Sequence, residues 1–319
     1  MQFRTKISIT KNNDSIGYNS KIVSLGSCFA ENMAEKLDYF KFQNTCNPFG
    51  IIFNPVAIEK MIHRMVNQSF YTAKDIFFHN ERWHCFEVHS DLSNANKQEL
   101  IANLNAILVA TKLQLQAASH IIITYGTSWV YRNIATNEIV ANCHKVPQKE
   151  FIKEILSVET IKKSMQNTLD LIQKINPNVN FIFTVSPVRH LKDGFVENQL
   201  SKAYLISAIY QILQSEICNQ KSAIYFPSYE IMMDELRDYR FYAADMIHPN
   251  AVAIDYIWQR FSETSIADES QSIMQEIETI QKGLSHRPFN PESESHQQFL
   301  SKLQDKIAKL QKQFPQIQF

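Results

Sequence analysis

Two nucleophilic side chains, Ser27 and Cys28, stand next to each other near the beginning of the chain. They follow Gly26 and an apolar run at 21–25, and a helical pattern at 29–40 comes after them. A nucleophile on a turn between a strand and a helix is exposed, and the helix N-terminal amides stabilise an oxyanion or a thiolate. The turn is therefore a candidate site of nucleophilic catalysis.

A candidate general base lies much later, in a segment at 245–249 that we expect to open a helix. Asp245 and His248 are three residues apart, and side chains at this spacing on a helical turn face the same way. The carboxylate then accepts from one imidazole nitrogen, and the other nitrogen faces the nucleophile as a general base. The spacing predicts a triad of Ser27 or Cys28 with His248 and Asp245.

Each of these residues also has a structural explanation. Ser27 is a common residue type for a helix N-cap, and Cys28 can pack as a small buried hydrophobe. His248 can make a purely structural bond to Asp245. The occurrence of both motifs in one chain favours a catalytic site over these alternatives.

The elements that must position these residues follow an alternating pattern. Short apolar runs predict buried parallel strands at 21–25, 120–125, 180–185 and 222–226. Amphipathic patterns predict helices at 29–40, 55–66, 98–115, 158–175 and 197–218, with Asn54 as the N-cap of the second and Pro55 at its first position. The alternation predicts an α/β fold with a doubly wound parallel sheet.

Two regions break the alternation. Segments 75–89 and 129–142 have the pattern of β-hairpins with polar tips, and their many aromatic residues suit a lid or a pocket wall over the sheet. Polar helical stretches at 262–283 and 297–314 follow, joined by a linker at 286–295. We therefore expect a catalytic domain at 1–262 and a C-terminal helical appendage at 263–319.

Composition narrows the class of protein. The 319 residues include 32 basic and 32 acidic side chains, a balance that gives no indication of a nucleic-acid partner. The N-terminal segment has no apolar secretory core, and no apolar run is long enough for a membrane span. The five cysteines, Cys28, Cys46, Cys85, Cys143 and Cys218, are expected to be free thiols in a reducing cytoplasm.

Several segments resemble the GSCFA family, which belongs to the SGNH (GDSL-type) hydrolase superfamily. The resemblance runs from about residue 20 to 262 and rests on VSLGSCFAENMAEKL at 23–37, NPFGIIFNP at 47–55, YGTSWVY at 125–131, NCHKVP at 142–147, SPVRHL at 186–191 and ADMIHPN at 244–250. It implies a flavodoxin-like sheet and ester hydrolysis. It also implies an oxyanion hole formed by the nucleophile amide, Gly50, Gly126 and Ser128.

The sequence departs from the superfamily pattern in two places. Gly126-Thr127-Ser128 stands where the superfamily has Gly-x-Asn, so that a hydroxyl replaces an amide donor. Gly26-Ser27-Cys28 stands where the superfamily has Gly-Asp-Ser; strict register makes Cys28 the nucleophile, and a shift by one residue makes it Ser27. Both alternatives remain open at this stage.

Further residues are candidates for substrate binding because ligands bind at the carboxyl ends of strands in such sheets. These are Asn47, Trp129, His144, Arg189 and His190. Arg189 suits a carboxylate or phosphate of the substrate, with a structural ion pair as the alternative. His79, His84, Cys85 and His89 alternate along a predicted hairpin, which scatters them over both faces; we expect neither a metal nor another cofactor.

The leading hypothesis is an esterase that removes an O-acyl group, by analogy an acetyl group, from a small molecule or carbohydrate. A thioesterase or acyltransferase with the same triad is an alternative within the enzymes. A binding or scaffold protein on a decayed SGNH fold is the alternative from another class, and the two departures from the superfamily pattern keep it open.

Overall fold

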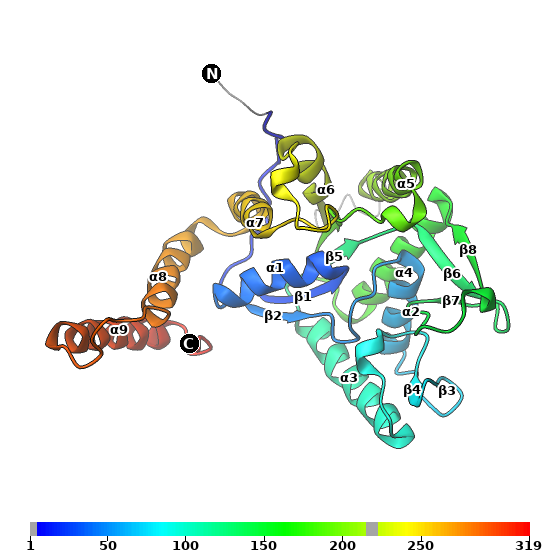
Figure 1. Ribbon diagram of the computed structural model, residues 1–319, viewed down its shortest axis with the longest axis horizontal. Helices are drawn as coiled ribbons and strands as arrows, with labels where there is room; N and C mark the ends of the chain where they lie inside the picture. The colour runs from blue at the N-terminus through cyan, green and yellow to red at the C-terminus, as the bar shows by residue number, and fades with distance from the viewer. Residues whose placement is uncertain (1–4, 215–222) are drawn as a thin grey trace.

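A five-stranded parallel sheet forms the centre of the computed structural model, which describes residues 5–214 and 223–319 (Figure 1). Its strands are β1 (Lys21–Gly26), β2 (Gln43–Cys46), β5 (His120–Tyr125), β9 (Asn180–Val185) and β10 (Ala223–Phe226). Their spatial order is β10-β9-β5-β1-β2, and every neighbouring pair is parallel. This is the flavodoxin-like order, so the predicted doubly wound α/β fold is confirmed.

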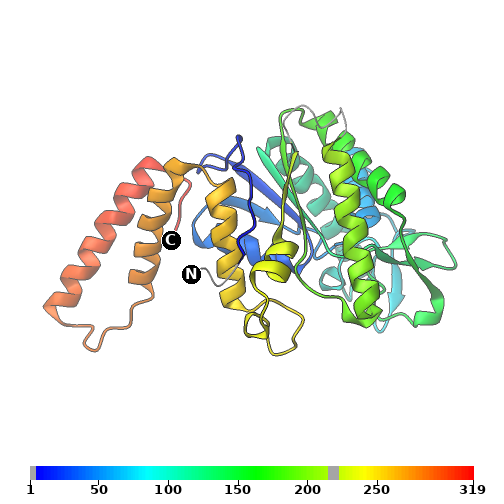
Figure 2. The ribbon, with the colours of Figure 1, turned by 90° about the horizontal axis from the view of Figure 1, so that it is seen from above.

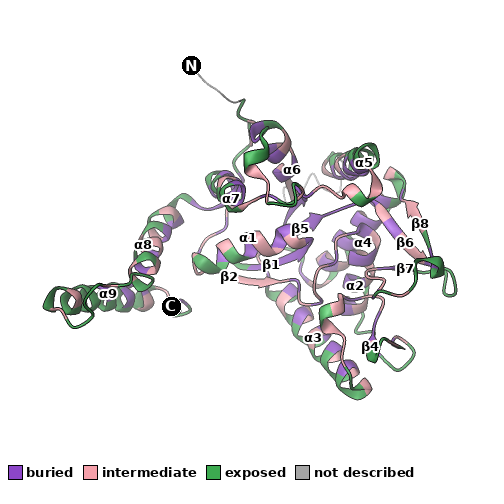
Figure 3. Cartoon of the chain, viewed as in Figure 1, coloured by how far each residue is buried: buried purple, intermediate pink, exposed green. Residues whose placement is uncertain are grey.

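Alternate residues of the inner strands enter two separate hydrophobic clusters, one on each face of the sheet. Val23, Ile121 and Phe181 pack in the first cluster, whereas Ile22 and Ile122 pack in the second. Helices α2 (Pro55–Val66), α3 (Lys97–Ala117), α4 (Val158–Ile175) and α5 (Phe195–Leu213) cover the first face. Helices α1 (Cys28–Tyr39) and α7 (Ala251–Ser265) cover the second. Burial of both faces explains why the inner strands are continuous apolar runs (Figure 3).

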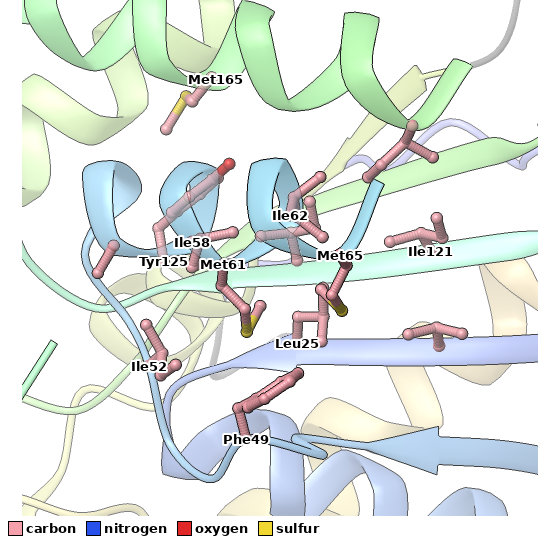
Figure 4. Packing of buried hydrophobic residues seen from close by; sticks show 14 of the residues in the cluster. Leu25, Phe49, Ile52, Ile58, Met61, Ile62, Met65, Ile121, Tyr125 and Met165 are labelled. Carbon is pink, nitrogen blue, oxygen red and sulfur yellow. The ribbon is translucent and has the colours of Figure 1, made fainter. Parts of the chain in front are cut away.

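Helix α2 shows how local sequence determines an element. Asn54 caps α2 by accepting from the Ala57 amide at 2.8 Å, and Pro55 occupies the first helical position, both as predicted. The buried face of α2, which includes Ile58, Met61 and Ile62, packs over β1 and β5 (Figure 4).

The predicted hairpins are both present. The first is β3 (Phe77–His79) with β4 (Arg82–His84), and the second pairs β6 (Trp129–Asn133) with β7 (Ile139–Val140). An additional strand, β8 (Phe151–Ile155), pairs with β6 and completes a three-stranded antiparallel sheet.

The remaining elements are short or C-terminal. Short helical turns are η1 (Ser90–Leu92), η2 (Gln148–Glu150), η3 (Leu191–Asp193), α6 (Ser228–Glu230), η4 (Ile231–Glu235) and η5 (Tyr239–Phe241). Helices α8 (Asp268–Leu284) and α9 (Glu294–Gln313) lie side by side at one end of the molecule (Figure 2). Residues 262–319, all of which the structure describes, form no strand of the sheet. Across the described ranges, no helix combines the length and apolar character of a membrane span.

Candidate active site

The turn after β1 requires a glycine. Gly26 has φ +131°, and a Cβ atom there would lie 2.1 Å from the carbonyl oxygen of Thr124 on the neighbouring strand. The Ser27 amide donates to that same carbonyl at 3.0 Å. Close approach of the two backbones therefore fixes the direction in which the chain leaves the sheet and enters α1.

Asn47, which directly follows β2, holds the turn from the other side. Its Oδ1 accepts from the Gly26 amide at 2.8 Å, and its Nδ2 donates to Glu31 Oε1 at 3.3 Å. The side chain is buried and does not line the cavity described below. We expected Asn47 to bind substrate; the structure instead gives it the task of positioning the nucleophile turn.

Ser27 and Cys28 open α1, and both line one cavity. Ser27 is only 2% exposed and is the N-cap of α1, with its Oγ accepting from the Phe29 amide at 3.3 Å. Cys28 is half-buried. Burial raises the pKa of the Cys28 thiol, the Glu31 carboxylate raises it further, and the Phe29 amide and the Lys202 ammonium oppose the shift. We expected a lowered pKa for a sulfur nucleophile, so this result gives no support to a thiolate that is formed before substrate binds.

His248 and Asp245 form a hydrogen-bonded pair in the loop before α7. His248 Nδ1 and Asp245 Oδ2 are 2.6 Å apart, and Asp245 Oδ1 accepts from the amides of Ile247 and His248 at 2.9 and 3.0 Å. Donation from the His248 amide, then the Ile247 amide and the His248 ring, lowers the pKa of Asp245 to about 2. The carboxylate is therefore ionised and fixes the orientation of the imidazole ring.

The loop geometry differs from the helical turn expected at 245–249. Met246 adopts φ +59°, and α7 begins only at Ala251, after its N-cap Asn250. The two side chains meet because the carboxylate turns back onto the loop amides, as in an Asx turn. The predicted pairing is thus present, but on a loop.

A cavity of about 570 Å³ brings the nucleophile turn and the His248 loop together. Ser27, Cys28 and His248 line it, and so do Trp129, Arg189 and His190 from the predicted binding residues. Its remaining walls are formed by Ile51, Phe53, Asn54, His89, Thr127, Val130, Tyr131, Val140, Ala141, Ser186, Val188, Leu191, Lys192, Asp193 and Ile247. The β6–β7 hairpin thus supplies a pocket wall, as its aromatic residues led us to expect.

Three of the expected oxyanion donors, Gly50, Gly126 and Ser128, already have hydrogen-bond partners in this structure. The Gly50 amide donates to Asn47 O at 2.7 Å, and the Gly126 amide donates to Phe53 O at 2.8 Å. The Ser128 amide and hydroxyl bond to Ser201 Oγ and O at 2.8 and 3.2 Å. Gly50, Gly126 and Ser128 also do not line the cavity. Their role as oxyanion donors stays a prediction, and in this structure each donor has an acceptor within the fold.

His144 also lies away from the cavity. It is 4% exposed, its Nε2 lies 2.7 Å from Cys85 O, and its ring packs near those of His84 and Phe86. Burial lowers its pKa to about 4, so the ring is neutral. The structure places His144 in the packing between the two hairpins and not among the substrate-facing residues. No cluster of three or more His, Cys, Asp or Glu side chains that could hold a metal ion occurs within 5–214 and 223–319.

Sequence patterns gave no indication of Lys202, the buried cation beneath the cavity. Its Nζ donates to Gly126 O at 2.6 Å and Ser186 O at 2.8 Å, the carbonyls directly after β5 and β9. Lys202 is fully buried, and burial lowers the pKa of its ammonium to about 7. A lysine at one position of a long helix carries no distinctive motif, so only the three-dimensional arrangement shows that it joins the ends of β5 and β9.

Comparison with known proteins identifies the family. The model of the GSCFA family matches residues 21–261, more than half of the chain. This chain belongs to the GSCFA family. A second model, the C-terminal domain of GSCFA domain proteins, matches residues 277–319. No curated protein matches the sequence.

Two solved structures with a similar arrangement are carbohydrate-active esterases. One is a family 3 carbohydrate esterase of Clostridium thermocellum, with 9% identity, coverage of 80% of this chain and 98% of the other, and a TM-score of 0.37. The other is an acetyl xylan esterase (Est2A) of the rumen bacterium Butyrivibrio proteoclasticus, with 11% identity and a TM-score of 0.37. The match covers 78% of this chain and 64% of the other.

Proposed function

We propose that this GSCFA protein is a hydrolase of ester bonds that works through a covalent acyl intermediate. One observation carries the proposal: the two candidate nucleophiles and the Asp245-bound His248 line the same cavity. A bound imidazole whose Nδ1 is occupied by a carboxylate has its Nε2 available as a general base. The arrangement supports the roles of nucleophile, base and orienting carboxylate for these residues.

The reaction has two steps. Ser27 Oγ or Cys28 Sγ attacks the acyl carbon of the ester while its proton passes to His248 Nε2. The tetrahedral intermediate then collapses, the alcohol leaves with that proton, and the acyl group stays on the enzyme. A water molecule attacks the acyl-enzyme with His248 again as the base, which releases the carboxylic acid and restores the nucleophile.

Among the expected oxyanion donors, the amide of the nucleophile is the one that belongs to a residue of the cavity lining. The N-terminal amides of α1 lie beside the nucleophile, and the helix dipole adds a partial positive charge at that end. Thr127 also lines the cavity, although its hydroxyl pairs with Ser201 Oγ at 2.8 Å. We propose the Cys28 amide as the principal oxyanion donor, because the next two amides of α1 already donate to Ser27.

The substrate class follows from the superfamily resemblance: an O-acyl group on a small molecule or carbohydrate. A thioesterase or acyltransferase would use the same first step, with a thiol as leaving group or an alcohol in place of water. Because the described cysteines are free thiols, we further propose that the protein works in the cytoplasm.

A direct assay separates an enzyme from a scaffold. Purified protein is incubated with p-nitrophenyl acetate, and release of nitrophenolate is compared between the natural chain and His248→Ala. We expect turnover in the first and at least a hundredfold less in the second, because the general base is lost. Equal rates in both proteins would contradict the proposal. If the natural chain shows no turnover and is labelled by neither a fluorophosphonate nor iodoacetamide, the scaffold is favoured.

A further inference from the structure

Arg189 differs from the other half-buried or buried arginines of this fold. Arg64, Arg132 and Arg260 each pair with glutamate carboxylates. Arg189 lies between this cavity and a second one of about 340 Å³, and lines both. It lacks an ion pair with any carboxylate of the described chain, and its Nη2 donates at 3.0 Å to the sulfur of Met233, which lines the second cavity. A thioether is a weak acceptor, so most of the hydrogen-bonding capacity of this guanidinium is unused. The structural ion pair considered as the alternative for Arg189 is absent here.

His190 presents a second unused polar group beside Arg189. Its Nε2 is buried and has no hydrogen-bond partner within the described ranges, although the residue lines the cavity. The ring is held in place by stacking on Phe53, with centroids 5.5 Å apart, and by the bond from its backbone amide to Asn198 Oδ1 at 2.8 Å. A buried polar atom without a partner is costly unless a ligand satisfies it.

The charges around this wall favour an anion. Lys192 lines the same cavity, and the ammonium of Lys202 lies beneath it. The one acidic residue of the lining, Asp193, already pairs with Lys153. Burial, followed by the charges of Lys202 and His248, lowers the pKa of His190 to about 3, so the ring is neutral. In the tautomer that carries its proton on Nε2, the ring can donate from that nitrogen.

We propose that Arg189 and His190 form a subsite for a carboxylate or phosphate group of the substrate. The planar guanidinium donates to two oxygens of such a group, and the imidazole Nε2–H donates to one of these oxygens or, in a phosphate, to a third. This inference rests on the proposed function and extends it: the natural substrate is an ester that carries a negative charge close to the bond that is cleaved.

A pair of model esters tests the subsite. Mono-p-nitrophenyl succinate carries a free carboxylate, and p-nitrophenyl butyrate has a neutral acyl chain of the same length. We expect Arg189→Met to lower the kcat/KM ratio of the anionic to the neutral ester about tenfold or more, since a charged hydrogen bond is lost. Arg189→Lys retains the charge and should lower the ratio less.

Arg237→Met is the matched control because Arg237 is an exposed arginine that already pairs with Asp234. It removes the same charge and should leave the ratio unchanged. Melting curves of all variants verify that each one folds. A ratio that is the same in the natural chain and in Arg189→Met would overturn the proposal.

A binding measurement that does not depend on ester hydrolysis tests the subsite independently of the proposed hydrolase activity. Succinate and inorganic phosphate are titrated into the natural chain by calorimetry. We expect saturable binding of one ion, with an affinity that falls tenfold or more in Arg189→Met and stays unchanged in Arg237→Met. This result supports the subsite even if no ester is hydrolysed. The ion that binds more tightly shows whether the subsite prefers a carboxylate or a phosphate. If neither ion binds while both esters are hydrolysed at similar rates, the hydrolase stands and the subsite falls.

Discussion

Gly26 is the residue at which a single added methyl group should do the most damage. Gly26→Ala would place a Cβ against Thr124 O in a region of φ that alanine disfavours. We expect the free energy of unfolding to fall by at least about 2 kcal/mol, measured by urea denaturation. Gly17→Ala is the control, because a Cβ there would meet only Ser270 Oγ at 3.8 Å; a similar loss in both variants would contradict the explanation.

Lys202 should make stability depend on pH in a defined direction. In the folded chain it loses its proton near pH 7, whereas an unfolded lysine keeps its proton to about pH 10.4. Between these values the unfolded state binds more protons, so the contribution of Lys202 to stability rises with pH. The contribution of Lys202 to the free energy of unfolding is smallest below about pH 7, rises between the two pKa values, and is constant again above about pH 10.4.

Denaturation of the natural chain and of Lys202→Met at pH 7 and pH 9 tests this. The free energy of unfolding of the natural chain should gain about 2 kcal/mol relative to the variant over this interval. Lys149→Met, at an exposed position, keeps Lys202, so its free energy of unfolding should rise over this interval as much as that of the natural chain. Parallel pH dependences of the natural chain and Lys202→Met would show that Lys202 does not titrate as described.

At the scale of elements, the turn at the end of β1 depends on the edge strand β2. Asn47→Ala would leave the buried Gly26 amide without its acceptor, which typically costs about 1–3 kcal/mol. We expect this loss of stability together with a changed rate of Cys28 alkylation by iodoacetamide. Asn44→Ala removes an amide from β2 without touching the turn and should leave the alkylation rate unchanged. An unaltered rate in Asn47→Ala would argue against its positioning role.

The elements differ in how far the sequence could predict them. Helix α2 follows its cap and proline signals, and the inner strands follow their continuous apolar runs. Strand β2 escaped prediction because it lies at the sheet edge, where its polar residues are only half-buried. Strand β8 escaped prediction because it pairs with β6 across an intervening strand, β7, and the segment that follows β7.

The site was predictable only in its motifs. The Gly-Ser-Cys turn and the pairing of Asp245 with His248 could be inferred from residue types and spacing. The sequence does not show, however, that the amides of Gly50 and Gly126 already have acceptors within the fold. Arg189 shows the opposite case, since only the structure reveals that no described carboxylate neutralises it.

At the scale of the whole molecule, we expect residues 1–262 to contain the whole catalytic site and residues 263–319 to form an appendage that takes no part in the reaction. Leu303 of α9 packs in the same cluster as Met274 and Ile277 of α8 and is 6% exposed. Leu303→Asp would place a charge in this interface and should make α9 sensitive to limited proteolysis. The reactivity of Cys28 should remain unchanged.

Leu300→Asp is the matched control on the same helix, because Leu300 is 40% exposed. It should resist proteolysis like the natural chain. Loss of Cys28 reactivity in Leu303→Asp, with the sheet still folded by circular dichroism, would mean that the C-terminal helices support the site directly.

The central claim is that residue 27 or 28 forms a covalent bond with the substrate acyl group, with His248 as the base. It is tested by labelling with a fluorophosphonate and with iodoacetamide, followed by peptide mass spectrometry. A serine nucleophile should give a fluorophosphonate adduct at Ser27 that is lost in Ser27→Ala and unaffected by Cys28→Ala. A cysteine nucleophile should give rapid alkylation at Cys28 and lose activity in Cys28→Ser.

Either result must weaken strongly in His248→Ala, and esterase activity must fall in the same variants that lose the adduct. The account predicts one labelled residue on the turn after β1, dependent on His248. Unchanged hydrolysis of a true substrate in both Ser27→Ala and Cys28→Ala would contradict the account, because neither residue would then be the nucleophile.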